Sequence, residues 1–372
     1  MDSRNILVTG GAGFIGSHLV DKLVDSGHRV RILDSLVDQV HNGEPPAHLN
    51  TGAEFVRADV CDAEAVGRAL EGIEVVYHQA AEVGVGQSMY EIVRYVRAND
   101  LGTAVLLEEM LKRRGQFSKL IVASSMSIYG EGAYRDPATE AAVYPQLRSD
   151  AQLAAHEWEL VEGGSVLEPI GTPEEKPLFP TSVYAVSKQD QEQYCLAVGR
   201  AYKIPTVAFR YFNVYGTRQA LSNPYTGVCA IFSSRLMNDQ APMIFEDGEQ
   251  SRDFVHVSDI VQANILALES DGADYQAVNI GTGRATSVKE IAQLLARGLG
   301  KEIEPEIVGK YREGDIRHCV ADISKARKLL GFEPQVTLEA GLEELLAWVS
   351  EQEADDKVQA ATDELAAHSL VK

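Results

Sequence analysis

The chain has 372 residues, of which 45% are hydrophobic and 24% are charged, as in an ordinary globular protein. Its 34 Lys+Arg and 55 Asp+Glu residues give a formal net charge of −21. A body this acidic repels nucleic acid and anionic membranes, so neither is expected as a partner. The four cysteines are scattered without CxxC spacing, which argues against a disulfide framework and against a bound metal.

Nothing in the pattern of the chain indicates export or membrane insertion. The first five residues lead directly into an apolar strand pattern, without the layout of a signal peptide. No apolar run reaches the roughly 20 residues that cross a bilayer. We therefore expect a cytoplasmic protein.

The first 125 residues alternate short apolar runs with longer helical patterns. Because strands that alternate with helices form right-handed crossovers, the pattern predicts a parallel sheet with helices on both faces. The predicted strands are 5–9, 29–33, 54–58, 74–78 and 119–123, and the predicted helices are 14–26, 63–70 and 99–114.

Residues 131–180 differ from their surroundings, because they are rich in Pro, Glu and Gly and only 150–161 has a helical pattern. A long segment with little regular structure inside a compact domain is usually functional or mobile. The alternation then resumes, with a strand at 206–212 and helices at 183–202, 227–237, 257–268 and 288–299. The polar tail 351–372 is expected to be a surface helix or a disordered end, and its composition favours the second.

A glycine-rich turn joins the first strand to the first helix. Gly10, Gly13 and Gly16 follow the strand, so a pyrophosphate can approach the backbone amides and the positive end of the helix. Asp34 ends the second strand, 18 residues after Gly16, where a carboxylate accepts hydrogen bonds from an adenosine ribose and repels a 2′-phosphate. The pattern predicts NAD as cofactor and disfavours NADP. Asp59, with Val60, either contacts the adenine or caps the next helix.

Two further patterns indicate catalysis. Tyr184 and Lys188 stand four residues apart, one helical turn, and a neighbouring ammonium favours the phenolate form of a tyrosine. Upstream, residues 124–130 read SSMSIYG directly after an apolar strand, whose end faces the ligand crevice of an open α/β sheet. Taken alone, the first pattern is a common surface pair and the second a serine-rich turn.

Together and in this order, these signals resemble the extended short-chain dehydrogenases, in particular the nucleotide-sugar epimerases and dehydratases. The likeness runs from Asn5 to about Trp348. It includes HQAA at 78–81, NDLGT at 99–103, RYFNVYG at 210–216, RDFVHV at 252–257, NIGTG at 279–283 and REGD at 312–315.

The resemblance implies roles for individual residues. Tyr184 is the base, Lys188 holds the nicotinamide ribose and tunes the tyrosine, and Ser125 binds the reacting hydroxyl. The implied cofactor ligands are Gly10, Gly13, Phe14, Ile15, Gly16, Asp34, Asp59, Val60, Ala80, Ala81, Asn99, Tyr184 and Lys188. The implied substrate ligands are Ser125, Ser127, Asn213, Arg252 and Arg312, the two arginines gripping a diphosphate. Each arginine has an alternative as a surface ion pair, Arg252 with Asp253 and Arg312 with Asp315.

The implied reaction is 4-epimerisation of a nucleotide-diphosphate sugar by transient oxidation at C4. A 4,6-dehydratase is the nearest competitor, but family dehydratases carry Asp-Glu where this chain has Met126 and Ser127, and neither of these exchanges a proton with carbon. A decarboxylase and an NADPH reductase remain open, the latter disfavoured by Asp34. A non-catalytic dinucleotide sensor is the alternative of another class, and sensors typically lose the Tyr or the Lys.

Substrate identity rests on a subgroup likeness. Residues 125–132 and 219–228 look most like dTDP-L-rhamnose 4-epimerases, which favours dTDP-L-rhamnose among dTDP- and UDP-hexoses. Cys319 stands where galactose epimerases have a bulky or a small residue near the sugar C2 substituent. The insertion 131–180 follows the active-site strand and is a lid or wall of the sugar pocket, an oligomer contact, or a decoration.

We expect a Rossmann-type doubly wound parallel sheet with a smaller C-terminal α/β substrate domain. The expected NAD domain is 1–213 plus 254–283, and the expected substrate domain is 214–253 plus 284–350. By family analogy the protein is a homodimer that pairs helices near 91–114 and 183–202.

Overall fold

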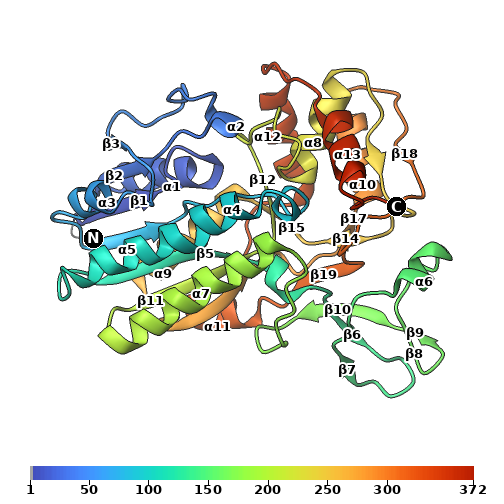
Figure 1. Ribbon diagram of the computed structural model, residues 1–372, viewed down its shortest axis with the longest axis horizontal. Helices are drawn as coiled ribbons and strands as arrows, with labels where there is room; N and C mark the ends of the chain where they lie inside the picture. Colours follow the sequence, from blue (N-terminus) through green and yellow to red (C-terminus); the bar gives the residue numbers. More distant parts are fainter. Residues whose placement is uncertain (1–2) are drawn as a thin grey trace.

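A parallel seven-stranded sheet lies at the centre of the computed structural model, which describes residues 3–372 (Figure 1). Its strand order is β16-β11-β5-β4-β1-β2-β3. The strands are β1 (Asn5–Thr9), β2 (Arg29–Asp34), β3 (Glu54–Arg57), β4 (Val75–His78), β5 (Lys119–Ser125), β11 (Thr206–Tyr211) and β16 (Gln276–Ile280). The order reverses between β1 and β4, which is the switch point where open α/β sheets bind ligands. The predicted α/β fold class is confirmed.

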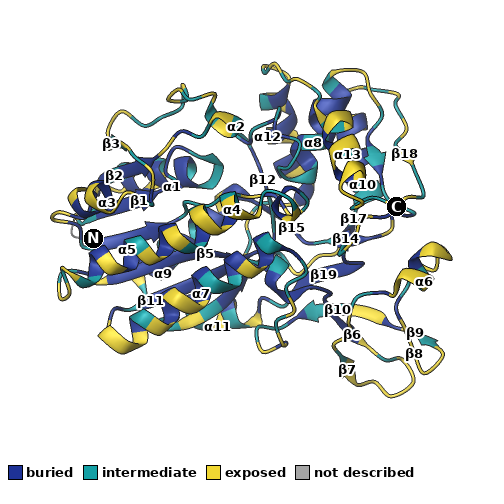
Figure 2. Ribbon diagram, in the orientation of Figure 1, coloured by how far each residue is buried: buried dark blue, intermediate teal, exposed yellow. Residues whose placement is uncertain are grey.

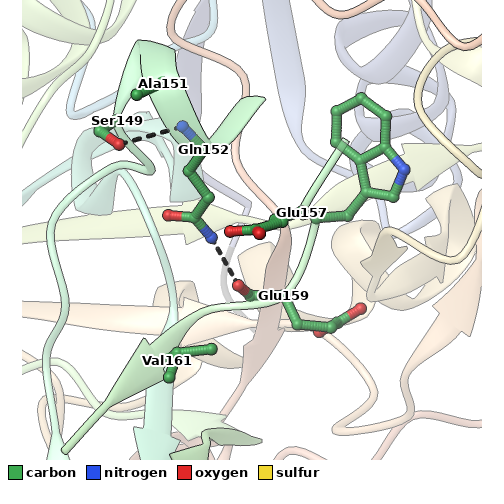
Figure 3. A pocket seen from close by; sticks show the side chains of 7 residues that line it. Ser149, Ala151, Gln152, Glu157, Glu159 and Val161 are labelled. Atoms are coloured by element: carbon green, nitrogen blue, oxygen red, sulfur yellow. Dashed lines mark hydrogen bonds between the residues drawn. The ribbon is translucent and has the colours of Figure 1, made fainter. Parts of the chain in front are cut away.

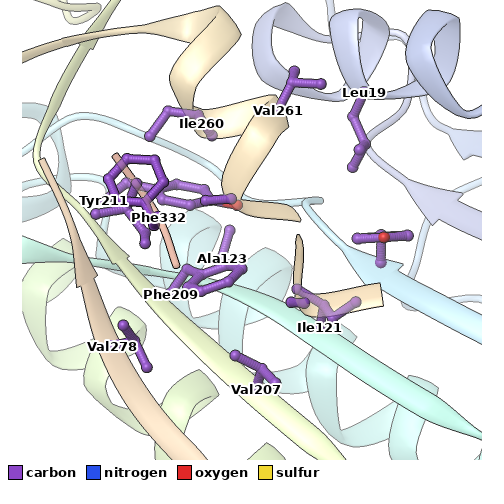
Figure 4. Packing of buried hydrophobic residues seen from close by; sticks show 14 of the residues in the cluster. Leu19, Ile121, Ala123, Val207, Phe209, Tyr211, Ile260, Val261, Val278 and Phe332 are labelled. Atoms are coloured by element: carbon purple, nitrogen blue, oxygen red, sulfur yellow. The ribbon is translucent and has the colours of Figure 1, made fainter. Parts of the chain in front are cut away.

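Helices cover both faces of this sheet. One face carries α1 (Phe14–Asp25), α9 (Val257–Glu269) and α11 (Ser324–Leu330), and the other carries α3 (Ala63–Ala69), α5 (Gly102–Leu111) and α7 (Val183–Tyr202). On the first face, Leu19 of α1 and Ile260 of α9 belong to one apolar cluster with Phe209 of β11 (Figure 4). The central strands β1, β4, β5 and β11 are almost continuously buried, as expected when both faces of a parallel sheet are covered, whereas the edge strand β3 has no buried residue (Figure 2).

A second, six-stranded sheet lies beside the first and has the order β17-β14-β19-β10-β6-β7. Its strands are β17 (Thr286–Ser287), β14 (Ser251–Arg252), β19 (His318–Ala321), β10 (Glu168–Thr172), β6 (Ala133–Arg135) and β7 (Ala142–Val143). A separate apolar core joins α8 (Val228–Met237), α10 (Val288–Gly298) and α12 (Leu338–Val349). Three short strand pairs complete the structure: β12 (Asn213–Tyr215) with β15 (Phe254–His256), β13 (Met243–Ile244) with β18 (Glu306–Ile307), and β8 (Val161–Glu162) with β9 (Ser165–Val166).

The insertion 131–180 is more regular than its composition predicts, because β6, β7 and β10 extend the second sheet and β8 and β9 form a hairpin. The expected helix at 150–161 is wrong beyond its first turn: α6 spans only Asp150–Ala154. The chain turns back there because His156 adopts a left-handed conformation (φ 58°) and the Gln152 side chain donates to the Glu159 carbonyl at 2.6 Å.

The disordered C-terminal end that composition favoured is also wrong. Residues Val358–Ala367 form helix α13, and the side chains of Ala361 and Leu365 are buried. Two apolar side chains one turn apart suffice to dock an otherwise polar helix, and such a sparse pattern is hard to recognise in a sequence. In the part of the chain that the structure describes, no helix combines the length and the apolarity needed to cross a membrane.

A buried ionic network fastens the insertion to the second part of the molecule. The Arg148 guanidinium makes two 2.8 Å hydrogen bonds to the carboxylate of Glu246, and both side chains are almost fully buried. Arg317 donates to the same carboxylate at 3.1 Å and to Asp247 at 2.7 and 2.9 Å. The Glu131 carboxylate accepts the backbone amides of Arg317 and His318, each at 2.8 Å. The insertion is therefore held to the second part of the molecule by buried charged contacts.

The network predicts an asymmetric response to charge removal. Glu246→Gln leaves the buried Arg148 with no carboxylate partner, so we expect the free energy of unfolding, measured in urea, to fall by about 3 kcal/mol. The matched control is Arg135→Gln in the same insertion, whose partners Glu140 and Glu168 are exposed, and it should leave stability nearly unchanged. Equal losses in the free energy of unfolding for the two variants would show that the buried network stabilises the fold no more than an exposed ion pair does.

Candidate active site

The glycine-rich turn between β1 and α1 lies against the end of β4. Gly10 has a left-handed conformation (φ 68°), and a Cβ there would lie 2.7 Å from the Ala80 amide nitrogen. A Cβ at Gly16 would lie 2.2 Å from the Gly10 carbonyl oxygen, so helix and turn pack in direct contact. Gly13 caps α1 without a side-chain hydrogen bond, and the first turn has no acidic residue. This helix end, with Phe14 and Ile15 as its first residues, suits an anion.

Asp34 lies at the end of β2 beside this turn. Its carboxylate accepts the backbone amides of Ala12 at 3.0 Å and Leu36 at 2.9 Å, which fixes it at the rim of the turn. Asp59 is half exposed, next to the buried Val60, and bonds the Cys61 amide at 2.8 Å. The helix-capping alternative for Asp59 is wrong, because Asp62 caps α3.

Ser125, Tyr184 and Lys188 meet at the carboxyl end of the sheet. Ser125 is the last residue of β5, and its hydroxyl accepts hydrogen bonds from the amide and the hydroxyl of Ser127, at 3.2 and 2.9 Å. Tyr184 lies in the first turn of α7, and its phenol is close enough to Ser125 for that hydroxyl to lower the pKa of the tyrosine. Lys188 follows one turn later and is 4% exposed. The structure thus brings together the three residues implied to be catalytic.

Burial dominates the ionisation of this group. It raises the pKa of Tyr184, against the opposing effect of the Ser125 hydrogen bond, and it lowers the pKa of Lys188 to about 8. Lys188 is therefore still mostly charged at pH 7, although its side chain is surrounded by protein.

A buried polar network holds the lysine from behind. Lys188 donates to the Gln191 side-chain oxygen at 2.7 Å, and the Gln191 amide donates to Thr103 at 2.9 Å. His78 bridges Thr9 at 2.8 Å and Thr103 at 2.9 Å through its two ring nitrogens. Gln191 was not predicted from the sequence as a partner of Lys188, although it lies three residues later on the same helical face.

Asn99 lies at the back of the site, in the π-helical turn η2 (Val96–Leu101) that joins α4 (Ile92–Tyr95) to α5. Its side chain is fully buried, donates to the Ser187 hydroxyl at 2.9 Å and bonds both backbone groups of Glu82, at 2.8 and 3.1 Å. Asn99 therefore ties the segment after Ala80 and Ala81 to α7, the helix that carries Tyr184.

The residues implied to hold the substrate come from several elements. Ser125 and Ser127 lie at the end of β5 and in η3 (Met126–Tyr129), Asn213 lies on β12, Arg252 on β14, and Arg312 in the loop before β19. Arg252 and Arg312 converge on Asp315, at 3.2 and 2.8 Å. The ion-pair alternative for Arg252 with Asp253 is wrong, because Asp253 instead accepts from Thr282. Arg312 does pair with Asp315, and its guanidinium lies 4.9 Å from the centre of the Phe245 ring.

Asp315 and Asn213 mark this region as a place for further ligands. Burial alone would raise the pKa of the Asp315 carboxyl, but the neighbouring arginines, Arg312 first, lower it. The side-chain oxygen of Asn213 is buried and has no hydrogen-bond partner in the described part of the chain. An unpaired buried acceptor is typical of a site that a polar ligand completes.

A surface cavity of about 740 Å³ lies elsewhere, in the insertion (Figure 3). It is lined by Ser149, Ala151, Gln152, Glu157, Trp158, Glu159 and Val161, and none of the implied site residues lines it. The polar side chains of Gln152 and Glu159 are already engaged, by the Glu159 carbonyl and by Arg317 respectively. We therefore do not assign this cavity to the active site.

Comparison with known proteins decides the family. Residues 6–155 match the NAD dependent epimerase/dehydratase family, and residues 164–345 match the GDP-mannose 4,6 dehydratase family. The chain is 38% identical to the dTDP-L-rhamnose 4-epimerase of Burkholderia thailandensis over 360 residues, which cover 96% of this chain and 98% of that protein. The chain belongs to the NAD-dependent epimerase/dehydratase family. The enzyme is an isomerase of the nucleotide-sugar 4-epimerase group, and its cofactor is NAD.

Solved structures agree with this assignment. The UDP-glucose 4-epimerase of Thermotoga maritima, crystallised with UDP-glucose, has a TM-score of 0.77 at 35% identity, with 93% of this chain and 99% of that chain covered. The UDP-glucuronic acid 4-epimerase of Bacillus cereus, in complex with UDP-glucuronic acid and NAD, has a TM-score of 0.77 at 29% identity, with the same coverage. The family resemblance read from the sequence is confirmed.

The residues of this enzyme fit NAD. The uncapped start of α1 suits the pyrophosphate, and the fixed carboxylate of Asp34 suits the adenosine ribose. Tyr184 and Lys188 lie at the end of β5, on the same edge of the sheet as Gly10, where the nicotinamide half has to reach.

The buried His78 predicts a pH-dependent stability. Burial lowers the pKa of His78 to about 3, so the folded enzyme keeps this ring neutral, whereas the unfolded chain takes up a proton below pH 6.5. Stability is therefore lost as the pH falls below 6.5. Between pH 7 and pH 5, the free energy of unfolding should fall by about 2 kcal/mol more in the wild type than in His78→Gln. Parallel pH profiles for the two proteins would contradict a neutral buried His78.

Proposed function

We propose that this enzyme inverts C4 of a nucleotide-diphosphate sugar, with dTDP-L-rhamnose as its substrate. The observation that carries the proposal is the meeting of Ser125, Tyr184 and the buried Lys188, one turn after Tyr184 on α7, at the end of β5 and beside a dinucleotide turn. The identity to the Burkholderia enzyme over nearly the whole of both chains supports the choice of sugar.

The side chains divide the work of a transient oxidation. Tyr184 takes the proton of the sugar 4-hydroxyl, and Ser125 hydrogen-bonds the same oxygen. Oxidation at C4 turns this oxygen into the carbonyl oxygen of a 4-keto sugar. NAD bound at the turn after β1 would supply the acceptor, and then the donor, of the C4 hydride. The charge of Lys188 favours the phenolate when the tyrosine has lost its proton, and Tyr184 then gives the proton back.

Epimerisation also requires the sugar ring to turn over between the two hydride transfers. The diphosphate must therefore be held firmly and the sugar loosely. Arg252 and Arg312 supply positive charge for the diphosphate on a protein with a formal net charge of −21. Near the sugar, Cys319 is buried and contacts Thr172 of the insertion at 3.8 Å, so the insertion contributes to the wall of the pocket.

A 4,6-dehydratase is the second candidate, because residues 164–345 match the GDP-mannose 4,6 dehydratase family. Dehydration needs a proton donor and acceptor near C5 and C6. Met126 and Ser127 follow Ser125 in η3 (Met126–Tyr129), and neither supplies such a pair. The epimerase is therefore favoured over the dehydratase.

The activity test uses purified enzyme without added NAD. Each of dTDP-L-rhamnose, UDP-glucose, UDP-glucuronate and UDP-N-acetylglucosamine is incubated separately, and the products are resolved by chromatography and proton NMR. We expect dTDP-L-rhamnose to be converted to its 4-epimer. Loss of water or of carbon dioxide would identify a dehydratase or a decarboxylase, and no turnover with NAD supplied would contradict the proposal.

The catalytic tyrosine has a matched control on the same helix. Tyr184→Phe removes the proton acceptor, and we expect kcat to fall about 10³-fold or more. Tyr202→Phe changes an exposed ring at the end of α7 and should leave kcat unchanged. An active Tyr184→Phe enzyme would assign the base to another group.

We also propose that two copies of the enzyme pair through α4, η2 and α7. Exposed apolar side chains gather on these elements: Ile92, Val93, Val96, Leu101, Val186 and Tyr194. Val93 is 81% exposed, which is unfavourable for a large apolar group unless another surface covers it.

Charged substitutions test this face. Val93→Glu combined with Val186→Glu should convert a dimer to a monomer in size-exclusion chromatography with light scattering. Val166→Glu, at an exposed position on β9, is the control and should not change the mass. A wild-type enzyme that is monomeric at micromolar concentration would contradict the proposed pairing.

A further inference from the structure

The C-terminal segment 358–372 runs between the two parts of the molecule. The residues just before it are anchored on the substrate side. The Asp355 amide donates to the Ser222 hydroxyl at 3.0 Å, and Asp356 pairs with Arg235 at 3.3 Å. Helix α13 follows (Figure 1).

Helix α13 then contacts the loop that follows the cofactor residues Ala80 and Ala81. Leu365 lies so close to Gly86 that a Cβ on this glycine would be 3.0 Å from the leucine methyl. The His368 ring stacks on Tyr90, with centroids 4.5 Å apart and planes 3° apart. This loop and the 3-10 turn η1 (Gln87–Met89) belong to the half of the molecule that binds NAD.

A chain of hydroxyl contacts joins the same two surfaces. The Tyr225 hydroxyl donates to the Glu364 carboxylate at 3.1 Å and lies 2.6 Å from the Tyr90 hydroxyl. Tyr225 belongs to segment 219–228, one of the two segments that resemble dTDP-L-rhamnose 4-epimerases. The segment 358–372 therefore fastens a loop of the NAD half to a loop of the substrate half.

The last residues pair with the backbone on both sides of Arg312. The amide of Tyr311 donates to the Lys372 carbonyl, and the Lys372 amide donates back, each at 3.0 Å. The Glu313 amide donates to the Leu370 carbonyl at 3.0 Å, and the Lys372 ammonium bonds the Glu313 carboxylate at 2.7 Å. These bonds make Val371 the bridge partner of Arg312 and hold the backbone of an arginine whose guanidinium is half exposed.

The segment therefore contacts the loop after Ala80 and Ala81, the segment 219–228 and the backbone beside Arg312. Ser88, in the loop that α13 covers, accepts the backbone amide of the catalytic Tyr184 at 3.0 Å. We propose that residues 358–372 complete the nucleotide-sugar site as a strap, which holds Tyr90 against Tyr225 and positions Arg312 for a nucleoside diphosphate. This proposal rests on the proposed function, because it takes Arg312 as a ligand of the diphosphate.

The first test is binding of dTDP to the NAD-loaded enzyme, measured by titration calorimetry. A chain that ends at Lys357 keeps the Asp356–Arg235 pair and lacks the strap. We expect its Kd for dTDP to rise at least 10-fold, and its hydrogen exchange to increase at 84–90 and 311–313. If neither dTDP nor UDP binds the full chain, the proposed function fails. If the full chain binds and the shortened chain binds equally well, only the strap is overturned.

If the shortened chain does not fold, point variants test whether residues 358–372 support substrate binding. Leu365→Ala removes the contact with Gly86, and Tyr225→Phe removes the hydroxyl shared by Glu364 and Tyr90. We expect each to raise KM for the nucleotide sugar about 3- to 10-fold with little change in kcat. Gln359→Ala, at an exposed position of α13, is the control and should change neither constant. A fall in kcat at constant KM would show that the segment acts on the chemistry and not on binding, and would overturn the proposal.

Discussion

The site depends on keeping a charged lysine and an ionisable phenol inside the protein. Burial opposes the charged form of both groups, as the raised pKa of Tyr184 and the lowered pKa of Lys188 show. The fold compensates with oriented dipoles, because Lys188 donates to the side-chain oxygen of Gln191 and the Ser125 hydroxyl lowers the pKa of the phenol. The lysine thus keeps its charge at neutral pH without a carboxylate hydrogen-bonded to it. Such a partner would fix the lysine as an ion pair and weaken its effect on the phenolate.

The second constraint is electrostatic and concerns the whole molecule. An enzyme with a formal net charge of −21 has to bind an anionic substrate, so its positive groups must be concentrated where the anion lies. Arg252 and Arg312 share a single counter-ion, Asp315, which leaves the pair with excess positive charge. Other buried arginines are neutralised more completely, since Arg317 is bonded by Glu159, Glu246 and Asp247. The first pair is suited to a ligand, and Arg317 is suited to holding the structure together.

Local patterns were enough to predict the NAD half and insufficient for the rest. The glycine turn, Asp34 and the Tyr184–Lys188 pair each depend on residues close in sequence, and helix α7 begins and ends where its pattern predicts. The insertion was misjudged, because β10 owes its place to pairing with β19, almost 150 residues away along the chain. The partners of Arg252 were misassigned for the same reason. Its sequence neighbour Asp253 is engaged by Thr282, and only the folded chain brings Asp315 within reach.

The positions of the fixed contacts follow from what epimerisation demands. A sugar that has to turn over needs space around it, so rigid contacts are best placed at the rim of the pocket and at the diphosphate. The buried network through Arg148 holds the insertion in place, and the pairing of Val371 with Arg312 holds the backbone of an arginine that we propose as a diphosphate ligand. The cofactor side is fixed by Asn99 and Ser187, behind the reacting groups. None of these contacts uses the hydroxyl of Tyr184 or of Ser125, so the frame is held rigid while the reacting oxygens stay available for the substrate.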